Sequence, residues 1–429
     1  MPSGPSPDSA LRTAAAAAGT APVALLAHCL RGPLAAPSQS GPRHTLLAVC
    51  PNSEAVARAA LRVAQEARAP LLFAATLNQV DRDGGYTGWT PDAFAQFVAA
   101  ESTRLGLDVP VFLGLDHGGP WKKDTHVRDG LDYDAALTET KRSITACLEA
   151  GYDLLHLDPT TDRRHPEAPV PIDRLVERTV SLLRHAEAAR SSAGRAPVAY
   201  EVGVEETGGE QNEDRFQDFC AGLADALRDT DLPRPAFVVG DVGTALASPA
   251  FDAERARRLA TTAEEQLGAL LKGHYTDDVA TPERYPLSGV GGANVGPGLS
   301  AVESDALHEL EALAQRLGHE AGLHRALRTA VVESGRWRKW LRPEEEGESF
   351  DDLSEERQRW LVDTGSRYVW TTSAVQQARA ALYDHVSTYR DADAYVQWRL
   401  RTAILRYLHA FNLVGLADRL AEALPEASP

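Results

Sequence analysis

The sequence predicts a closed (β/α)8 barrel, also called a TIM barrel, followed by a helical extension. Eight short apolar stretches alternate with helix-like segments between residues 44 and 320, and strand-like stretches stop after that point. Such alternation is typical of parallel α/β folds, and eight units favour a closed barrel over an open doubly wound sheet. The 429 residues are enough for a barrel of roughly 250 residues and an appendage.

Each predicted strand is a short apolar run, and each predicted helix carries apolar residues at helical spacing. The strands are Thr45–Cys50, Leu71–Leu77, Val111–Asp116, Leu154–Asp158, Val198–Val204, Ala236–Gly240, Leu267–His274 and Gly292–Val295. The helices are Ser53–Ala69, Pro91–Gly106, Tyr133–Ala150, Pro171–Arg190, Glu213–Arg228, Asp252–Glu265 and Ser300–Leu317. The fifth strand is irregular because it contains Glu201, and the eighth because it has few apolar residues.

Two segments flank the predicted barrel of residues 44–320. Residues 1–43, rich in Ala, Ser and Pro, are expected to form a mobile N-terminal tail with at most a short helix around His28. They lack the basic start and Leu-rich core of a signal peptide. Residues 321–429 keep helical periodicity and carry the aromatic clusters Arg336–Trp340 and Arg367–Trp370. We expect these helices to pack on the barrel or on a partner subunit.

Composition limits the partners and the compartment. The formal net charge of -17 argues against nucleic acid or an anionic membrane surface as the main partner. No window approaches the length of apolar sequence that a membrane span needs. The four cysteines, Cys29, Cys50, Cys147 and Cys220, contain no CxxC pair. This indicates a reducing compartment and no thiolate zinc site, so we expect a cytoplasmic protein.

Polar side chains follow most of the predicted strands, at the end where barrel enzymes keep their catalytic groups. The third strand shows this best, because its apolar run ends in Asp116, His117 and two glycines. Histidine can bind a metal and aspartate can move a proton. The alternative is a strand cap that only hydrogen-bonds a loop. The other strand-end residues are Asn78, Gln79, His156, Asp158, Glu205, Asp241 and His274.

His117, His274 and one carboxylate form a candidate metal set, because strand ends converge at one rim of a barrel. Two imidazoles and an acid suit Zn²⁺ with a position left for substrate, and Mn²⁺, Co²⁺ or Fe²⁺ also accept them. The alternative is that both histidines hydrogen-bond substrate. His156 shares a side of its strand with Asp158, and it fits either a hydrogen-bonding core residue or a ligand.

The segment Asn294–Ser300 ends the eighth strand and opens a helix. Loops after strands seven and eight of barrels commonly bind phosphate through backbone N–H groups and a helix N-terminus. Gly296 and Ser300 suit that role. The alternative is an ordinary helix cap by Ser300.

Several motifs are specific enough to suggest a family. They are Asn78-Gln79-Val80 with Gly84-Gly85-Tyr86-Thr87-Gly88, Asp116-His117-Gly118-Gly119-Pro120, His156-Leu157-Asp158 and Val295-Gly296-Pro297. Together they resemble the non-catalytic subunit family of class II tagatose-1,6-bisphosphate aldolase, from about Cys50 to about residue 380. The resemblance implies a barrel of the class II aldolase type with a helical C-terminal extension. An older label of relatives, tagatose-6-phosphate kinase, fits badly, because the chain has no Walker loop and no GxGxxG.

The resemblance also implies a function, a metal-dependent epimerase that acts at C4 of a phosphorylated ketose by retro-aldol and aldol chemistry. The alternatives are a class II aldolase, a non-catalytic subunit that stabilises a catalytic partner, and an isomerase that moves a proton at C3. Partners would be the sugar phosphate and either a second copy of the chain or an aldolase subunit. Asn294 stands where the family commonly has Lys, so the resemblance leaves the sugar open between the family's usual one and a different one.

In this scheme each candidate residue has a role. His117, Glu205 and His274 would hold the divalent metal, with Zn²⁺ as first choice and Mn²⁺ or Co²⁺ as alternatives. Asp116 and Asp158 would transfer protons. The substrate-binding residues would be Asn78, Gln79, Gly85, Tyr86, Thr87, His156, Asp241, Asn294, Gly296 and Ser300.

Overall fold

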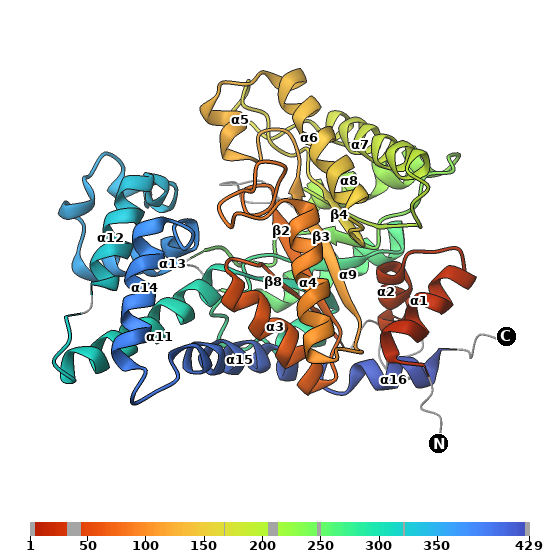
Figure 1. Cartoon of the computed structure of the whole chain (residues 1–429). Helices are drawn as coiled ribbons and strands as arrows, with labels where there is room; N and C mark the ends of the chain where they lie inside the picture. Colours follow the sequence, from red (N-terminus) through yellow and green to blue (C-terminus); the bar gives the residue numbers. More distant parts are fainter. Residues whose placement is uncertain are drawn as a thin grey trace.

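A closed barrel of eight parallel strands forms the centre of the molecule (Figure 1). The computed structural model describes residues 5–31, 44–166, 168–204, 213–246, 250–320 and 322–424. Each strand pairs with the next in sequence, and β8 pairs with β1. The strands are β1 (Leu46–Val49), β2 (Leu71–Thr76), β3 (Val111–Gly118), β4 (Leu154–Leu157), β5 (Ala199–Gly203), β6 (Phe237–Val239), β7 (Leu270–Gly273) and β8 (Val290–Val295). The predicted barrel is therefore confirmed.

Helices cover the outside of the barrel, and their ends explain why most predicted bounds are close. They are α3 (Glu54–Ala67), α4 (Pro91–Leu105), α5 (Asp124–Arg128), α6 (Tyr133–Glu149), α7 (Ile172–Ser192), α8 (Glu213–Leu227), α9 (Ala253–Leu267), α10 (Arg284–Leu287) and α11 (Pro297–Arg316). The Thr90 side chain caps α4, and Gly106 ends it with φ 59°. The seventh strand starts later than predicted, because Gly268, with φ 64°, ends α9 inside the predicted strand.

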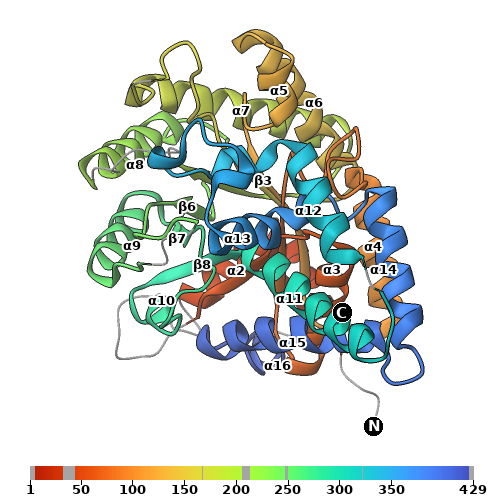
Figure 2. The ribbon, with the colours of Figure 1, turned by 90° about the vertical axis from the view of Figure 1, so that its left-hand side faces the viewer.

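The C-terminal helices form a lobe and a return path. They are α12 (Leu323–Ser334), α13 (Glu355–Gly365), α14 (Ser373–Val386), α15 (Ala392–Ala410) and α16 (Leu416–Ala423). In Figure 2, α12 and α13 lie in front of the barrel strands, and α15 runs back along the barrel beside α3. Val396, Leu400 and Ile404 recur at helical spacing on α15 and are completely buried. The predicted helical extension is confirmed, and its Trp337 packs edge-on against Phe350.

The predicted mobile N-terminal tail is wrong for much of its length. Residues in this segment form α1 (Pro7–Ala17) and α2 (Pro22–Arg31), and Leu11 is completely buried. The Arg12 guanidinium donates to Asp153 Oδ1 at 2.8 Å and to the Val111 carbonyl at 2.9 Å. These helices therefore dock where β3 and β4 begin, at the end of the barrel away from the lobe of α12, α13 and α14, and α1 lies beside α16 (Figure 1). An Ala-rich composition concealed their apolar faces.

Within the described ranges, no single helix is long and apolar enough to cross a membrane. Only when α1 and α2 are taken together do they have the length and apolar composition of a membrane span, and the angle between the two helices is 98°. Leu26 and Leu30 of α2 belong to the apolar core of the protein.

Candidate functional site

A bulge at the end of β3 brings two consecutive side chains to the barrel mouth. Neighbouring residues of a regular strand point to opposite faces. Here the pairing of β3 with β4 shifts between Leu115 and Gly118, and His117 adopts φ 50°. Such irregularities re-aim side chains. As a result, the Asp116 side chain is buried, and the distance between His117 Nε2 and Asp116 Oδ2 is 3.9 Å.

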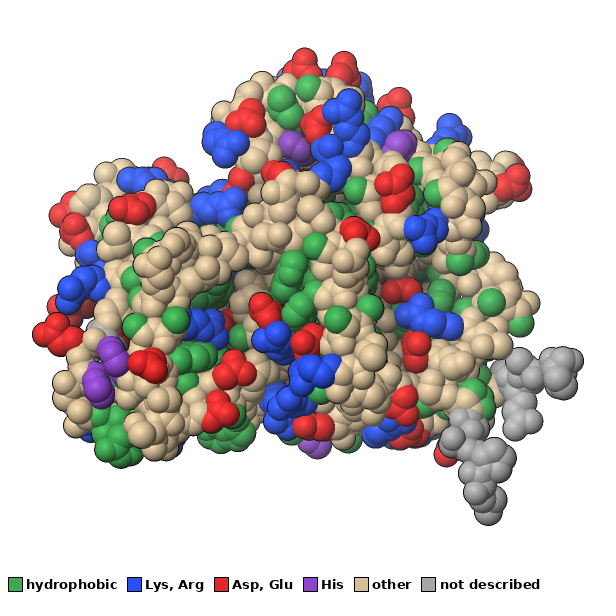
Figure 3. Space-filling view, in the orientation of Figure 1, with side chains coloured by type: hydrophobic (Ala, Val, Ile, Leu, Met, Phe, Trp, Pro, Cys, Tyr) green, Lys and Arg blue, Asp and Glu red, His purple; other side chains and the backbone are tan. Residues whose placement is uncertain are grey.

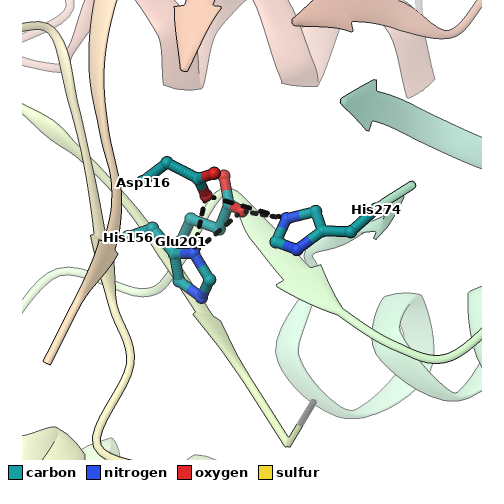
Figure 4. A group of neighbouring side chains, drawn as sticks. All are labelled: Asp116, His156, Glu201 and His274. Carbon is teal, nitrogen blue, oxygen red and sulfur yellow. Dashed lines mark hydrogen bonds and ion pairs between the residues drawn. The ribbon is translucent and has the colours of Figure 1, made fainter. Parts of the chain in front are cut away.

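Four buried side chains from four strands, β3, β4, β5 and the end of β7, meet at this mouth (Figure 4). They are Asp116, His156, Glu201 and His274. His156 Nδ1 lies 3.1 Å from Asp116 Oδ1 and 3.5 Å from Glu201 Oε1. His274 Nε2 lies 3.4 Å from Glu201 Oε1 and 3.8 Å from Asp116 Oδ1. Tetrahedral bonds of about 2.0–2.2 Å place ligand atoms about 3.3–3.6 Å apart. The group could therefore hold a divalent metal.

His117 lies beside this group and is fixed by a carboxylate. Its Nδ1 donates to Asp158 Oδ2 at 2.6 Å, and its ring centroid is 4.9 Å from that of His274. Asp158 also lies 2.9 Å from Lys122 Nζ. A carboxylate behind a histidine fixes the tautomer and the orientation of a metal ligand. The structure thus brings together the predicted pair His117 and His274, and it shows Asp158 behind His117.

The charges at the mouth favour ionised carboxylates. Burial favours the neutral acid, but His117 and His274 hold the pKa of Asp116 well below its usual range. Burial likewise works against the charged form of His117, while Asp116 and Asp158 raise the pKa of that ring above its ordinary value. Asp116 is therefore ionised at neutral pH and can accept a proton or a cation.

Two of the buried charges were not predicted from the sequence. Glu201 on β5 accepts a hydrogen bond of 2.6 Å from Lys272 Nζ on β7, and both side chains are almost completely buried. Burial opposes ionisation of Glu201, but Lys272, His156 and His274 lower its pKa to about 2. The available signal was an acid inside an apolar strand, because buried charges in a strand need partners. The predicted ligand Glu205 lies outside the described residues.

Several predicted substrate-binding residues converge through Asn52, which the sequence did not single out. Asn52 Oδ1 accepts from Gln79 Nε2 at 2.7 Å and from the Tyr86 hydroxyl at 3.2 Å. Asn52 Nδ2 donates to the Gly296 carbonyl at 2.6 Å. Gln79, Tyr86 and Gly296 therefore line one side of the mouth, next to β1, β2 and β8. Their role in binding substrate stays a prediction.

Asn78, Gly85 and Thr87 make contacts that shape the loops around the mouth. Asn78 Nδ2 donates to the Lys122 carbonyl at 3.0 Å, and Thr87 Oγ1 donates to the Gln79 carbonyl at 2.6 Å. Gly85 has φ 52°, and a Cβ there would lie 2.2 Å from the Gln79 carbonyl oxygen. Only glycine fits this close approach.

Asn294 and Asp241 are placed differently. Asn294 Nδ2 lies 3.2 Å from Asp116 Oδ2, so Asn294 belongs to the mouth. Asp241 accepts the backbone N–H of Gly243 at 2.8 Å and pairs with Arg255 of α9 at 3.1 Å. These contacts connect Asp241 to its own loop and to a surface helix.

The backbone amides expected to bind phosphate are already engaged. Asp277 Oδ1 accepts the N–H of Gly296 at 2.9 Å and that of Gly298 at 2.7 Å. Ser300 is completely buried, and its hydroxyl has no hydrogen-bond partner among the described residues. A carboxylate of the protein therefore occupies the N-terminus of α11.

Replacing Asp277 by Asn should change how stability depends on pH. Burial raises the pKa of Asp277 from its ordinary 3.8 to about 6, against the two amides that lower it. The folded state then holds this proton more tightly, so the wild type loses stability as pH rises from about 4 to about 6. This loss in the free energy of unfolding is about 3 kcal/mol. The variant should not show it, because the Asn side chain does not titrate. Urea unfolding at several pH values should show that the free energy of unfolding of the variant increases relative to that of the wild type as the pH rises. A difference between the two proteins that does not change with pH would contradict this prediction.

Another group of potential ligands lies outside the mouth. Asp305 and His308 on α11 and Asp363 on α13 have ligand atoms close together. His308 Nε2 lies 2.8 Å from His324 Nδ1. This group belongs to the contact between the barrel and the extension.

Comparison with known sequences identifies relatives of the chain. Residues 33–230 match the family described as D-tagatose-1,6-bisphosphate aldolase subunit GatZ/KbaZ-like. The chain is 26% identical over 383 residues to a D-tagatose 6-phosphate 4-epimerase of Agrobacterium fabrum, covering 82% of this chain and 86% of the relative. It is 30% identical over 175 residues to the D-tagatose-1,6-bisphosphate aldolase subunit GatZ of Escherichia coli, covering 40% of each.

Solved structures share the fold. A protein of Sinorhizobium meliloti described as a probable tagatose 6 phosphate kinase superposes with a TM-score of 0.67 at 25% identity, covering 85% of this chain and 100% of its own. A fructose-bisphosphate aldolase of Campylobacter jejuni superposes with a TM-score of 0.52 at 11% identity, covering 87% and 91%. The second match concerns the fold alone, and it shows that this barrel fold is shared with a fructose-bisphosphate aldolase.

Proposed function

The chain belongs to the GatZ/KbaZ-like family of D-tagatose-1,6-bisphosphate aldolase subunits, and from this premise we propose that it is a metal-dependent 4-epimerase of a phosphorylated ketose. The observation that carries this proposal is the group of Asp116, His156, Glu201 and His274, whose donor atoms have the spacing of a metal site. A relative that covers most of the chain is named as such an epimerase. A protein that served only as a scaffold would not need these buried charges at a barrel mouth.

The four residues of this group would hold a divalent metal, for which Zn²⁺ is our first choice and Mn²⁺ or Co²⁺ are alternatives. His117 and the predicted Glu205 are further candidate ligands. A bound cation would supply Lewis acidity for the ketose carbonyl. Lys272 balances Glu201 from the barrel interior, so the site does not accumulate uncompensated negative charge.

Protein side chains would carry the protons of the reaction. Asp116 is ionised at neutral pH and would accept the proton of the C4 hydroxyl. His117 Nε2 lies near the same carboxylate, and Asp158 holds the opposite side of that ring, so this pair can take up or return a proton. Gln79, Tyr86 and Asn294 are candidates to bind hydroxyl groups of the sugar.

The chemistry follows from loss of the C4 hydroxyl proton. The C3–C4 bond breaks, its electron pair stays on the C3 fragment as an enediolate, and C4 becomes an aldehyde carbon. Renewed attack on the opposite face of the aldehyde inverts C4, and the hydroxyl regains its proton. Release of the aldehyde before attack would be the aldolase reaction, so one site can serve either outcome.

The purified chain should interconvert D-tagatose 6-phosphate and its C4 epimer, followed by NMR. Dialysis against a chelator should remove this activity, and added Zn²⁺, Mn²⁺ or Co²⁺ should restore it. In deuterium oxide the product should carry no carbon-bound deuterium, because cleavage and renewed attack need no exchange at carbon. Full activity after removal of all metal would contradict the proposal. Deuterium at C3 would favour an isomerase.

A second candidate is a non-catalytic subunit that stabilises an aldolase. One relative is named an aldolase subunit. Large apolar side chains also stay exposed on the extension, where Trp398 is 55% and Tyr389 is 70% exposed. This reading predicts no turnover by the chain alone and activity only when a catalytic aldolase is added.

A further inference from the structure

The usual phosphate position of the barrel is closed to a second anion. The Gly296 and Gly298 amides donate to Asp277, and a Cβ at Gly298 would lie 2.9 Å from Asp277 Oδ1. An anion brought to this helix end would meet a carboxylate that already uses the same donors. A charged end of the substrate therefore needs a cation elsewhere at the mouth.

Arg367 is a buried cation that suits this need. It lies in the short 3-10 segment η4 (Ser366–Tyr368) of the extension and is only 4% exposed. It donates to the Thr364 carbonyl and, at 2.8 Å, to the Tyr368 hydroxyl. Over the ranges that the structure describes, Arg367 takes part in no ion pair with a carboxylate. A guanidinium offers five N–H donors, so several remain for a ligand.

Contacts between the extension and the β2 loop bring chain neighbours of Arg367 to the mouth. The rings of Tyr86 and Tyr368 meet edge to face with centroids 5.1 Å apart, and Thr371 Oγ1 donates to the Tyr86 carbonyl at 2.9 Å. The Arg336 guanidinium lies over both rings, 5.5 Å from Tyr86 and 4.9 Å from Tyr368. The extension therefore forms part of the rim of the site.

The electrostatic surroundings of two buried groups agree with this placement. Burial raises the pKa of the Tyr86 hydroxyl, and the largest opposing influence on this pKa is the charge of Arg367. Burial also raises the pKa of the Cys50 thiol, at the end of β1, where Asp116 and Asp277 act in the same direction and Arg367 opposes them. The charge of Arg367 thus acts on groups at the same end of the barrel as the carboxylates of the mouth.

The surface of the molecule is indented at this junction. Figure 3 shows a notch between the lobe of the extension and the end of the barrel that carries α5, with Lys and Arg side chains close to it. Arg336 of the extension pairs with Asp124 of α5 at 3.2 Å, and Lys339 pairs with the same carboxylate. These ion pairs hold the two parts together across the mouth.

We infer that the extension supplies an anion subsite to the barrel, in which Arg367 binds the terminal oxyanion of a sugar substrate beside the contact of Tyr86 with Tyr368. The shared chemistry is an oxyanion at the end of the sugar chain, either phosphate or carboxylate. The identification of the ligand as a sugar rests on the proposed function, whereas the binding of an anion by Arg367 does not. It makes the helical extension part of substrate recognition.

The test compares three substrates with the wild type and Arg367→Gln. They are a ketose 6-phosphate, the corresponding hexuronate and the neutral ketose. Gln keeps a polar side chain but removes the charge. We expect kcat/KM for the anionic substrate that the wild type prefers to fall about 10–100-fold, because charge-assisted hydrogen bonds are lost. The value for the neutral ketose should change less than threefold (order of magnitude).

The ratio between substrates separates recognition from folding, because a misfolded fraction lowers all three values equally. Arg379→Gln is the matched control, since Arg379 is another largely enclosed arginine of the extension but pairs with Glu303. That control should leave the ratio unchanged. If Arg367→Gln lowers kcat/KM only for the ketose phosphate or only for the hexuronate, that substrate carries the anion that Arg367 binds. An unchanged or parallel response of all substrates overturns the subsite.

A binding measurement covers the case in which the chain turns over none of these sugars. Inorganic phosphate should raise the unfolding temperature of the full-length wild type and leave that of Arg367→Gln unchanged. Equal stabilisation of both proteins, or of neither, would contradict the subsite. Stabilisation of the wild type alone, without turnover, would retain the subsite and refute the epimerase.

Discussion

Asp116→Asn should lower kcat for C4 epimerisation by about 10²–10⁴-fold, the range that a positioned proton-transfer group contributes. The change removes a negative charge that faces His156, His274 and Asn294. It therefore removes both the proposed proton acceptor and one metal donor, while shape and volume are kept. Steady-state rates and metal content of the purified variant measure the effect.

A control for this variant is Asp129→Asn, an exposed acid in the loop after the same strand, which pairs only with neighbouring Arg128 among the described residues. It should stay within about twofold of wild-type turnover. If Asp116→Asn kept its full rate and its metal, the mouth of the barrel would not be the site of the chemistry.

Glu201→Leu should lower the free energy of unfolding by about 3–5 kcal/mol, because it leaves the Lys272 ammonium buried without its carboxylate. The double variant Glu201→Leu with Lys272→Met removes both charges and should recover most of this loss. Urea unfolding of the metal-free proteins gives both values.

The comparison between single and double variants is the essential feature of this test. A simple packing defect would make the double variant at least as unstable as the single one. Recovery in the double variant assigns the loss to the unpaired charge. A single variant as stable as the wild type would contradict a buried ion pair in the barrel.

The sequence was sufficient for the barrel because local patterns determine it. Apolar strands, capped helices and terminating glycines recur along the chain, and each can be recognised without knowing its neighbours in space. The docked helix α1 was missed for the opposite reason. Its stability comes from contacts of Leu11 and Arg12 with distant strands, which no local pattern reveals.

The sequence predicted those site residues that directly follow a strand. It did not predict the features that depend on how distant segments pack together. The convergence of the ends of β3 and β7, which carry Asp116, His117 and His274, follows from barrel topology alone. The bulge that turns Asp116 and His117 to one side depends on the pairing of β3 with β4. Glu201 was visible as an irregularity in a strand, but its role depends on neighbours from three other strands. The occupation of the α11 N-terminus by Asp277 likewise needs coordinates.

The most direct test of the metal site is anomalous diffraction from crystals of the full chain grown with Zn²⁺. The peak should lie among Asp116, His156, Glu201 and His274, within bonding distance of at least three of these side chains. No peak at this place, or one only at Asp305, His308 and Asp363, would contradict a metal-dependent reaction at the barrel mouth.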